Sequence, residues 1–325
     1  MPNRRNPDFL LQKGLKISHL RMMAAFAETG QIGAAATALG ITQPAASRLL
    51  AEIERIAGVP VHIRSGRGVT LTEAGEVLAR RAGRVLLEMR DAGRELVEAG
   101  AGAVGRVGIG AVTAPALNIV LPTLRTARLS HPGIQAEVTV ASSDILCAQL
   151  LSGKIDFAIG RIPVGVDASQ LQGRVIAPEP VALVVRKGHR FANTAPVDPA
   201  DLMQFDWVMP DKDIPIGAAV LARLQELGLP APQQRLSTAS FLLTLALLQQ
   251  TNAIAPLAQA VADQFATGPD APFACVANNL GITVAPYSLL TRRDTVLPPA
   301  ARTILDLISR LIDTQASEIR QGASA

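Results

Sequence analysis

The sequence predicts a mostly helical N-terminal unit that ends in a long amphipathic helix, followed by a larger α/β unit. Three patterns predict this arrangement: two helices and a hairpin near the N-terminus, an apolar row over residues 71–99, and alternating strands and helices from residue 106 onward. A chain of 325 residues is long enough for two or three domains, each with its own core.

Residues 41–58 predict the helix around which the N-terminal unit is organised. Thr42 is a candidate N-cap, Pro44 suits the first turn, and Gly58 is a stop signal. One side is apolar at about 100° per residue. The opposite side begins with an amide, a hydroxyl and a guanidinium among small residues, namely Gln43, Pro44, Ser47 and Arg48.

Those side chains suit the major groove of DNA, because Gln can read adenine, Arg can read guanine, and Ser can serve a base or a phosphate. An ordinary amphipathic helix with a solvated outer face would explain the same helix taken alone. Its neighbours favour the DNA interpretation. Helices are expected over residues 18–28, with Ser18 as its cap, and 32–39, after a polar and mobile leader at 1–16.

A hairpin is expected directly after the 41–58 helix. Two β-prone runs flank the turn at residues 65–68, and Arg64 and Arg67 lie on either side of it. Two helices with a short turn between them and a hairpin beside them make a winged helix-turn-helix over residues 17–72. The two arginines are placed to touch phosphates or a minor groove.

The positive charge of the chain lies in this part. The net charge is +4, and residues 1–72 hold nine Lys or Arg against four Asp or Glu. The remainder holds 22 basic and 23 acidic residues. This asymmetry indicates a polyanion as the partner of the N-terminal unit alone.

A long helix is expected over residues 73–99, with an apolar seam at spacings of three and four. Such a row needs a partner helix, and a second copy of the chain is the simplest one; packing on its own domain is the alternative. The residues expected at the dimer contact are Leu78, Val85, Met89 and Leu96. Residues 100–105, rich in Gly and Ala, then form a hinge.

The segment 17–100 resembles the DNA-binding region of LysR-type transcriptional regulators. The likeness lies in the string Ile-Thr-Gln-Pro-Ala-Ala-Ser-Arg at residues 41–48, and in Leu-Thr-Glu-Ala-Gly at residues 71–75 after the wing. One position departs from the family pattern. His62 and Ile63 follow Val61 where the family usually has Leu-Phe before the wing arginine, so a buried aromatic anchor is in doubt.

The resemblance implies roles for the residues of the N-terminal unit. Gln43, Pro44, Ser47 and Arg48 would face base edges of double-stranded DNA, and Arg64 and Arg67 would reach the backbone or minor groove. The 73–99 helix would form a homodimer. Members of the family commonly assemble as tetramers, and RNA polymerase is a further candidate partner.

The resemblance also implies the architecture of the larger unit. The family joins its DNA reader to an effector domain similar to bacterial solute-binding proteins, with two α/β lobes. We expect this domain at 106–315, with lobe I at about 106–161 and 267–315, lobe II at about 162–266, and a tail at 316–325. A fainter likeness to the subgroup named after a galactose-binding-protein regulator implies a sugar or related effector.

Strand and helix patterns in this unit give candidate effector loops. Strands are expected at 106–112, 134–140, 156–159, 181–185, 206–209 and 282–285, and helices at 115–129, 145–151, 216–227, 241–249, 257–264 and 300–312. Ligands of α/β sheets bind beyond the carboxyl ends of strands, at helix N-termini. The residues at such positions are Thr113, Ala114, Ser142, Ser143, Thr238 and Ser240.

Hydroxyls and free N–H groups there would suit a small polar or anionic effector, a sugar or a carboxylate. Plain helix caps would explain each loop equally well. We expect no metal or cofactor, because the four His are scattered and the two Cys lack ligand spacing. No secretory or membrane-spanning segment is visible, which predicts a cytoplasmic protein.

The sequence therefore predicts a ligand-responsive, sequence-specific DNA-binding regulator. A cytoplasmic small-molecule-binding protein without functional DNA binding is the alternative. An enzyme on the α/β scaffold is disfavoured, because no nucleophile elbow, P-loop, dinucleotide fingerprint or zinc-protease motif is present.

Overall fold

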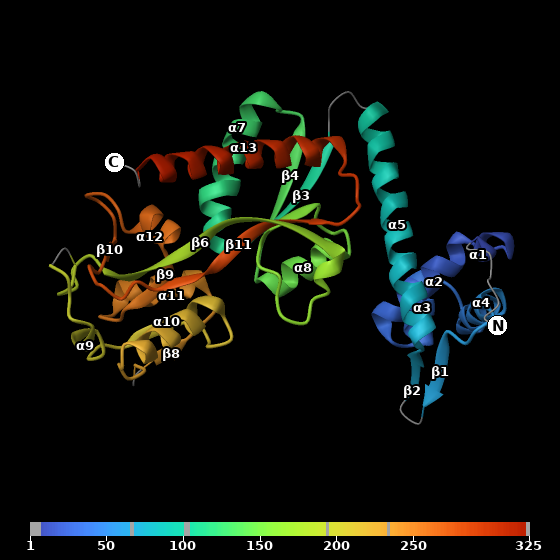
Figure 1. The fold of residues 1–325 in the computed structure, drawn as a ribbon, viewed down its shortest axis with the longest axis horizontal. Coiled ribbons are helices and arrows are strands. Elements are labelled where there is room, and N and C mark those ends of the chain that lie inside the picture. The colour runs from blue at the N-terminus through green and yellow to red at the C-terminus, as the bar shows by residue number, and fades with distance from the viewer. Residues whose placement is uncertain (1–7, 66–67, 101–104, 193–194, 233–234, 323–325) are drawn as a thin grey trace. The chain divides into compact units, whose positions relative to one another are not determined.

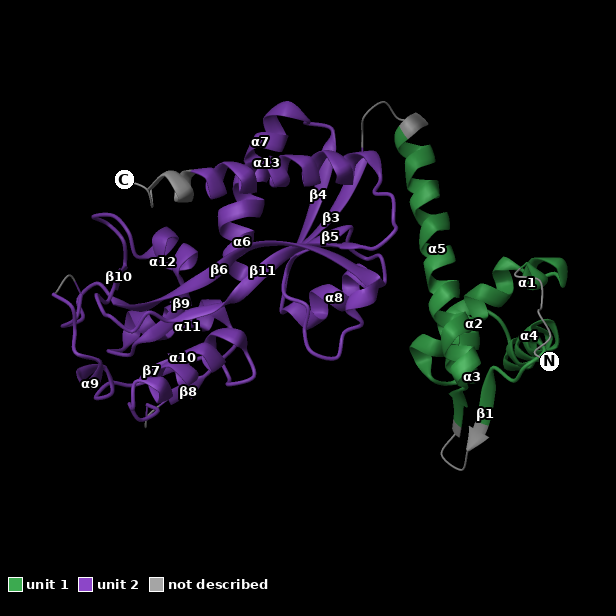
Figure 2. Cartoon of the chain, viewed as in Figure 1, with its two compact units in different colours: residues 1–102 green, residues 103–325 purple. Residues whose placement is uncertain are grey.

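A computed structural model describes residues 8–65, 68–100, 105–192, 195–232 and 235–322. The chain divides into two compact units, residues 1–102 and 103–325 (Figure 2). The division falls inside the expected hinge at 100–105, of which residues 101–104 lie outside the described part.

The N-terminal unit consists of helices with one hairpin (Figure 1). Its elements are α1 (Phe9–Gln12), α2 (Ile17–Thr29), α3 (Ile32–Leu39), α4 (Gln43–Ala57), β1 (His62–Ser65), β2 (Gly68–Leu71) and α5 (Glu73–Gly100). Helix α1 lies within the mobile leader expected at 1–16. Residues 1–7 lie outside the described part.

The cap of α2 differs from the expected one. The helix begins at Ile17 and its N-cap position is Lys16, so Ser18 lies inside the first turn. The Lys16 N–H donates to Nδ1 of His19 at 3.0 Å. The buried side chain of His19 thus accepts the N–H of the N-cap residue itself.

The core of this unit joins α2 and α4. Met22, Met23 and Phe26 of α2 and Leu50 and Ile53 of α4 are at most 1% exposed and belong to one cluster. Each such side chain contributes about 1.5–3 kcal/mol by leaving water. The inner face predicted for the 41–58 helix is therefore the face that holds the unit together.

One glycine sets how closely α5 approaches the hairpin. A Cβ on Gly75 would lie 2.0 Å from the carbonyl oxygen of Val61. Only a residue without a side chain fits that gap. The glycine of the Leu-Thr-Glu-Ala-Gly string is thus explained by packing at the base of the wing.

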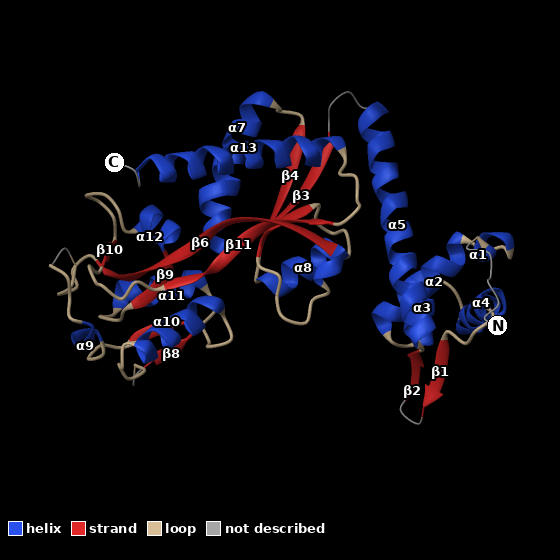
Figure 3. Ribbon diagram, viewed as in Figure 1, coloured by secondary structure: helices blue, strands red, loops and turns tan. Residues whose placement is uncertain are grey.

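The second unit alternates strands and helices (Figure 3). Its strands are β3 (Gly105–Ala111), β4 (Ile134–Val140), β5 (Phe157–Gly160), β6 (Leu171–Arg186), β7 (Trp207–Met209), β8 (Arg235–Ser237), β9 (Ala255–Ala258), β10 (Phe273–Cys275) and β11 (Thr283–Arg292). Its helices are α6 (Thr113–Pro115), η1 (Ala116–Val120), α7 (Leu121–Ser130), α8 (Ser143–Leu151), η2 (Ala168–Gln170), α9 (Pro199–Leu202), α10 (Pro215–Glu226), α11 (Phe241–Gln250), α12 (Gln259–Phe265) and α13 (Pro299–Gly322).

Strand pairing separates two lobes. In the first lobe the order is β4, β3, β5, β11, β6, with β3 parallel to β4 and β5. In the second lobe β6 pairs with β9 and β10, and β7 pairs with β8. The long strands β6 and β11 run through both lobes, as Figure 1 shows.

This pairing corrects the expected lobe boundaries. Residues 171–174 of β6 pair with β11 in the first lobe, although the sequence predicts residues 162–266 in the second. Strand β10 pairs with residues 184–186 of β6 in the second lobe, although it falls within the range 267–315 assigned to the first. Because β6 and β11 each belong to both lobes, no single residue of either strand marks the boundary between the lobes.

Several elements also differ in extent. The strand expected at 181–185 is the end of β6, which begins at Leu171. The helix expected at 257–264 begins two residues later, because Leu257 and Ala258 belong to strand β9. Helix α13 continues to Gly322, so the tail expected at 316–325 is helical over most of its length.

Candidate nucleic-acid interface and ligand site

The predicted reader residues lie at the open N-terminal end of α4. Thr42 occupies the N-cap position, but its side chain makes no capping hydrogen bond. Gln43, Pro44, Ser47 and Arg48 are all exposed. The opposite face of α4 is buried in the core of the unit, so the helix that carries these side chains is held firmly in place.

Their polar groups are also available. Within the described residues, the side chains of Gln43, Ser47 and Arg48 have no hydrogen-bond partner and no ion pair. Base edges and phosphates in a groove could satisfy them without breaking any contact inside the protein. This is the arrangement that the predicted role requires.

The wing is present as a hairpin beside this helix. His62 pairs with Leu71 and Arg64 pairs with Val69 in an antiparallel ladder. The backbone of Arg64 thus lies near the tip of β1, and its side chain is not described. Arg67 lies outside the described residues, so its expected contact stays a prediction.

A histidine and a glutamate join the wing to the reader helix. Oε1 of Glu54 accepts the N–H of Val61 at 2.9 Å and the N–H of His62 at 3.4 Å, and Nδ1 of His62 lies 3.0 Å from the same oxygen. The His62 ring stands edge-on to Phe26, with centroids 6.4 Å apart. His62 therefore fills the place of the aromatic anchor that the sequence left in doubt.

A second histidine holds α4 from the other side. Nε2 of His19, which is 1% exposed, lies 3.2 Å from Oε2 of Glu52. This hydrogen bond lowers the pKa of the Glu52 carboxyl. The sequence shows both histidines only as scattered residues, because nothing in their spacing indicates that each meets a glutamate of α4.

The apolar row on α5 has two parts. Ala82 is fully buried and Leu78 packs against the core of the same unit, so the beginning of the row serves the domain itself. Val85, Met89 and Leu96 are 43%, 59% and 75% exposed. The exposed part is the surface on which a partner helix could lie.

The first two candidate ligand loops are neighbours in the second unit. Oγ of Ser143 accepts the N–H of Arg161 at 3.0 Å, and a Cβ on Gly160 would lie 3.2 Å from that Oγ and 3.6 Å from Val112. The loop after β3, with Thr113, and the loop before α8, with Ser142 and Ser143, therefore meet beside the end of β5. Ala114 is 3% exposed and packs with the second-lobe cluster around Ala255.

The third loop is separate. Oγ1 of Thr238 accepts the N–H of Ser240, and Oγ of Ser240 caps α11 by accepting the N–H of Leu243 at 3.3 Å. Within the described residues no hydrogen bond joins Thr238 or Ser240 to the other two loops. The convergence expected from the sequence is thus seen for two loops of the three.

The sequence missed a polar cluster beside these loops. Nη2 of Arg161 donates to Oε2 of Glu179 at 2.6 Å, and Nε donates to the carbonyl of Ala285 at 2.8 Å. The guanidinium lies 5.9 Å from the ring centre of Tyr287. Burial raises the pKa of Tyr287, while a hydrogen bond with Asn118 acts in the opposite direction.

A signal for this cluster existed in the sequence. Arg161 follows directly after a buried strand, which is the position at which ligands of α/β sheets bind. Glu179 lies between Pro178 and Pro180, an unusual place for a charged residue within a strand.

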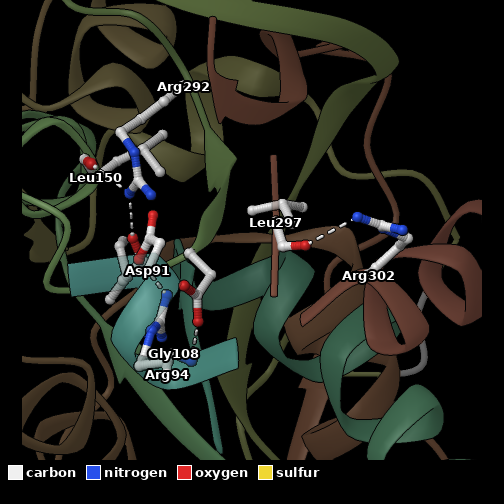
Figure 4. Close-up of polar contacts among 9 residues, drawn as sticks. Asp91, Arg94, Gly108, Leu150, Arg292, Leu297 and Arg302 are labelled. Carbon is white, nitrogen blue, oxygen red and sulfur yellow. Dashed lines mark hydrogen bonds and ion pairs between the residues drawn. The ribbon is translucent and has the colours of Figure 1, made fainter. Parts of the chain in front are cut away.

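Buried polar contacts fix the remainder of the first lobe. Nη1 of Arg292, which is 7% exposed, donates to the carbonyls of Leu150 and Ile155 at 3.1 and 3.2 Å (Figure 4). The carboxylate of Asp156 accepts the N–H of Gly108 at 2.8 Å. These bonds satisfy backbone groups near the end of α8, before β5 and within β3.

Neither cysteine has the surroundings of a reactive thiol. Cys147 is buried and Cys275 is partly buried, and burial raises the pKa of both thiols, which disfavours the reactive thiolate. Across the part of the chain that is described, no group of three His, Cys, Asp or Glu side chains could hold a metal ion. None of the described helices is long and apolar enough to cross a bilayer.

These features define a winged helix-turn-helix regulator with a ligand-binding domain. They are the exposed tip of the reader helix, the wing, a long helix with an exposed apolar row, and a two-lobed α/β unit. The family model of the bacterial regulatory helix-turn-helix protein, lysR family, matches residues 17–76. The LysR substrate binding domain model matches residues 100–312. The chain belongs to the LysR family of transcriptional regulators.

Similar proteins agree with this assignment. The HTH-type transcriptional regulator GbpR of Rhizobium radiobacter is 45% identical over 79% of this chain and 86% of its own length. GbpR of Azospirillum brasilense is 33% identical over 100% of this chain and 95% of its own. The chain is therefore a transcriptional regulator with a DNA-binding and an effector-binding domain.

Solved structures share the fold. Full-length CbnR complexed with its target DNA is 23% identical, covers 91% of this chain and 100% of its own, and has a TM-score of 0.58. ArgP from Mycobacterium tuberculosis is 17% identical, covers 90% and 96%, and has a TM-score of 0.63. The predicted fold class, a winged helix-turn-helix with a long helix followed by an α/β effector domain, is confirmed.

Proposed function

We propose that Gln43, Ser47 and Arg48 read the operator in the major groove, with Pro44 beside them and Arg64 and Arg67 of the wing on the backbone or minor groove. The exposed and unbonded polar tip of α4 carries this proposal. A helix whose other face is fully packed can enter a groove without rearranging.

A salt titration with an operator duplex selected from random sequences tests this function. Fluorescence anisotropy should show a steep loss of affinity with rising salt, because phosphate contacts release counterions. Arg48→Ala should weaken binding by about 10- to 100-fold. Arg55→Ala is the matched control, since Arg55 is exposed at the far end of the same helix. Binding that is absent or independent of salt would favour a small-molecule-binding protein without DNA binding.

We infer that α5 joins two copies of the chain through Val85, Met89 and Leu96. Three large apolar side chains that are exposed to water along one row of a helix are best explained by a coiled coil. Met89→Glu should reduce the mass measured by analytical ultracentrifugation, whereas Arg80→Glu, off the row on the same helix, should not. An unchanged mass for Met89→Glu would contradict this interface.

A homotetramer needs a second contact between chains. Among the described strands, β4 lies at one edge of the first-lobe sheet, and its residues Val138 and Val140 are 38% and 54% exposed. An unpaired edge strand with apolar side chains suits pairing with a second copy. The same sedimentation experiment gives the mass, and Val140→Lys should convert a tetramer into a dimer.

We further propose that the effector is a small polar or anionic molecule, a sugar or a carboxylate, bound where the loops of Thr113 and Ser143 meet. Hydroxyls and the N-terminus of α8 would hold its polar groups. Thermal shift of the full chain with D-galactose, D-galacturonate and benzoate tests this, since a ligand of the folded state raises the melting temperature. A regulator of this kind acts in the cytoplasm, where the chromosome lies.

A further inference from the structure

The backbone ladder is weak where the chain passes between the two lobes. On β6, Pro178 and Pro180 flank Glu179, and on β11 Pro286 lies in the irregular register before Tyr287. Proline has no N–H to donate, and an irregular register leaves residues without a ladder partner. The crossing strands therefore need support from outside their own pairing.

Arg161 supplies donors at this place. Its Nε–H donates to the carbonyl of Ala285 on β11, and its Nη2–H donates to Glu179 on β6, at 2.8 and 2.6 Å. A planar guanidinium can bind both strands at once, because its donors point in fixed directions. The arginine itself is rooted in the first lobe, at the end of β5, where its own N–H donates to Ser143.

The ion pair is shielded from water. The side chains of Arg161 and Glu179 are 15% and 7% exposed. Another pair on β6, Arg174 with Asp313, is 46% and 64% exposed. Solvent screens the second pair more than the first, so we expect the first pair to restrain the strands more strongly.

We propose that Arg161 is a positioning residue that fixes the path of β6 and β11 between the lobes, and with it the angle between them. We call Arg161, with its bonds to Glu179 and Ala285, the strut. The hydrogen bond from the Arg161 N–H to Ser143 joins the strut to a candidate effector loop, and in that respect the inference rests on the proposed function. A ligand that moves the Ser143 loop would act on the crossing through Arg161.

Hydrogen–deuterium exchange by mass spectrometry on the full chain tests the strut. In Arg161→Gln, amides at 175–182 and 283–288 should exchange at least about tenfold faster, while those of β3 stay unchanged, because only the crossing loses its support. Arg161→Lys keeps the positive charge but lacks the planar guanidinium, so it should protect these amides from exchange only in part. The matched control, Arg174→Gln, should exchange like the wild type.

Two results would overturn the inference: wild-type exchange at the crossing in Arg161→Gln, or a rise that is equal in β3 and β5, which would make Arg161 an ordinary core residue. If Arg161→Gln does not fold, Glu179→Gln decides, with faster exchange at 175–182 for the strut and wild-type exchange against it. No DNA or effector takes part in the measurement. A failure of the proposed DNA-reading function would therefore leave this result unaffected.

Discussion

The two units hold their candidate functional side chains in opposite ways. Gln43 and Arg48 on α4 are exposed and bond to nothing in the described protein, while Ser143, Thr238 and Ser240 in the effector domain already accept backbone N–H groups. Substitution on α4 should therefore change affinity and leave stability alone. Substitution in the effector loops should change stability first, so a loss of ligand response there needs a folding control.

The largest effect should come from Gly75→Ala, which tests whether α4 is held rigidly. The new Cβ would lie 2.0 Å from the Val61 carbonyl oxygen, so α5 or the wing must shift. We expect the N-terminal unit to lose about 3 kcal/mol of unfolding free energy. Urea unfolding followed by circular dichroism measures this. Gly83→Ala on the same helix meets nothing within 4 Å and should stabilise it slightly; equal effects of both would refute the close approach.

Gln43→Ala should come next and should act on recognition alone. Loss of a bidentate contact to a base should cost about 1–3 kcal/mol of discrimination at one base pair. Anisotropy with operators changed one base pair at a time locates that position. The melting temperature should stay at the wild-type value. A uniform weakening over all operators would mean that Gln43 contacts the backbone and reads no base.

Ser143→Ala should show the opposite behaviour. It removes the acceptor of the Arg161 N–H and should destabilise the effector domain by about 1–2 kcal/mol. Ser152→Ala is the control, because the Ser152 hydroxyl donates to Gln149 at an exposed helix end. Differential scanning calorimetry resolves the transition. DNA affinity should be unchanged, and a loss of it without loss of stability would break the comparison.

The smallest effect should be a dependence on pH in the second lobe. Burial lowers the pKa of His189, and the charges of Arg186 and Arg190 act in the same direction. The unfolded chain then binds a proton more readily than the folded one, so stability should fall as pH drops below about 6.5, the ordinary value for histidine. Unfolding between pH 8 and 5 should show a slope that His189→Asn reduces. His131→Asn, at an exposed site, should keep the slope.

The sequence was sufficient for the N-terminal unit, because each of its signals is local. Pro44, Gly58 and the apolar period of 41–57 define α4, and its outer face follows from the same period. The sequence was insufficient for the dual role of β6, since pairing with β11 in one lobe and β9 in the other joins residues far apart in the chain.

The effector site shows the same limit. Ser143 could be named from its place after a strand, whereas Arg161, Glu179 and Ala285 come together only through the crossing of β6 and β11. His62 was noticed as a departure from the family pattern, yet its meaning needed Glu54, eight residues away on another element. Charged groups that pair across a long stretch of chain produce no periodic pattern in the sequence.

The contact between Glu54 and the start of the wing has a consequence for sequence variation among related proteins. One carboxylate oxygen accepts two backbone N–H groups and lies 3.0 Å from Nδ1 of His62, so we expect residues 54 and 62 to vary together. Among relatives of this chain, an apolar side chain at the second position should be accompanied by a changed partner at the first. Grafting this hairpin onto another regulator should succeed only when both residues travel together.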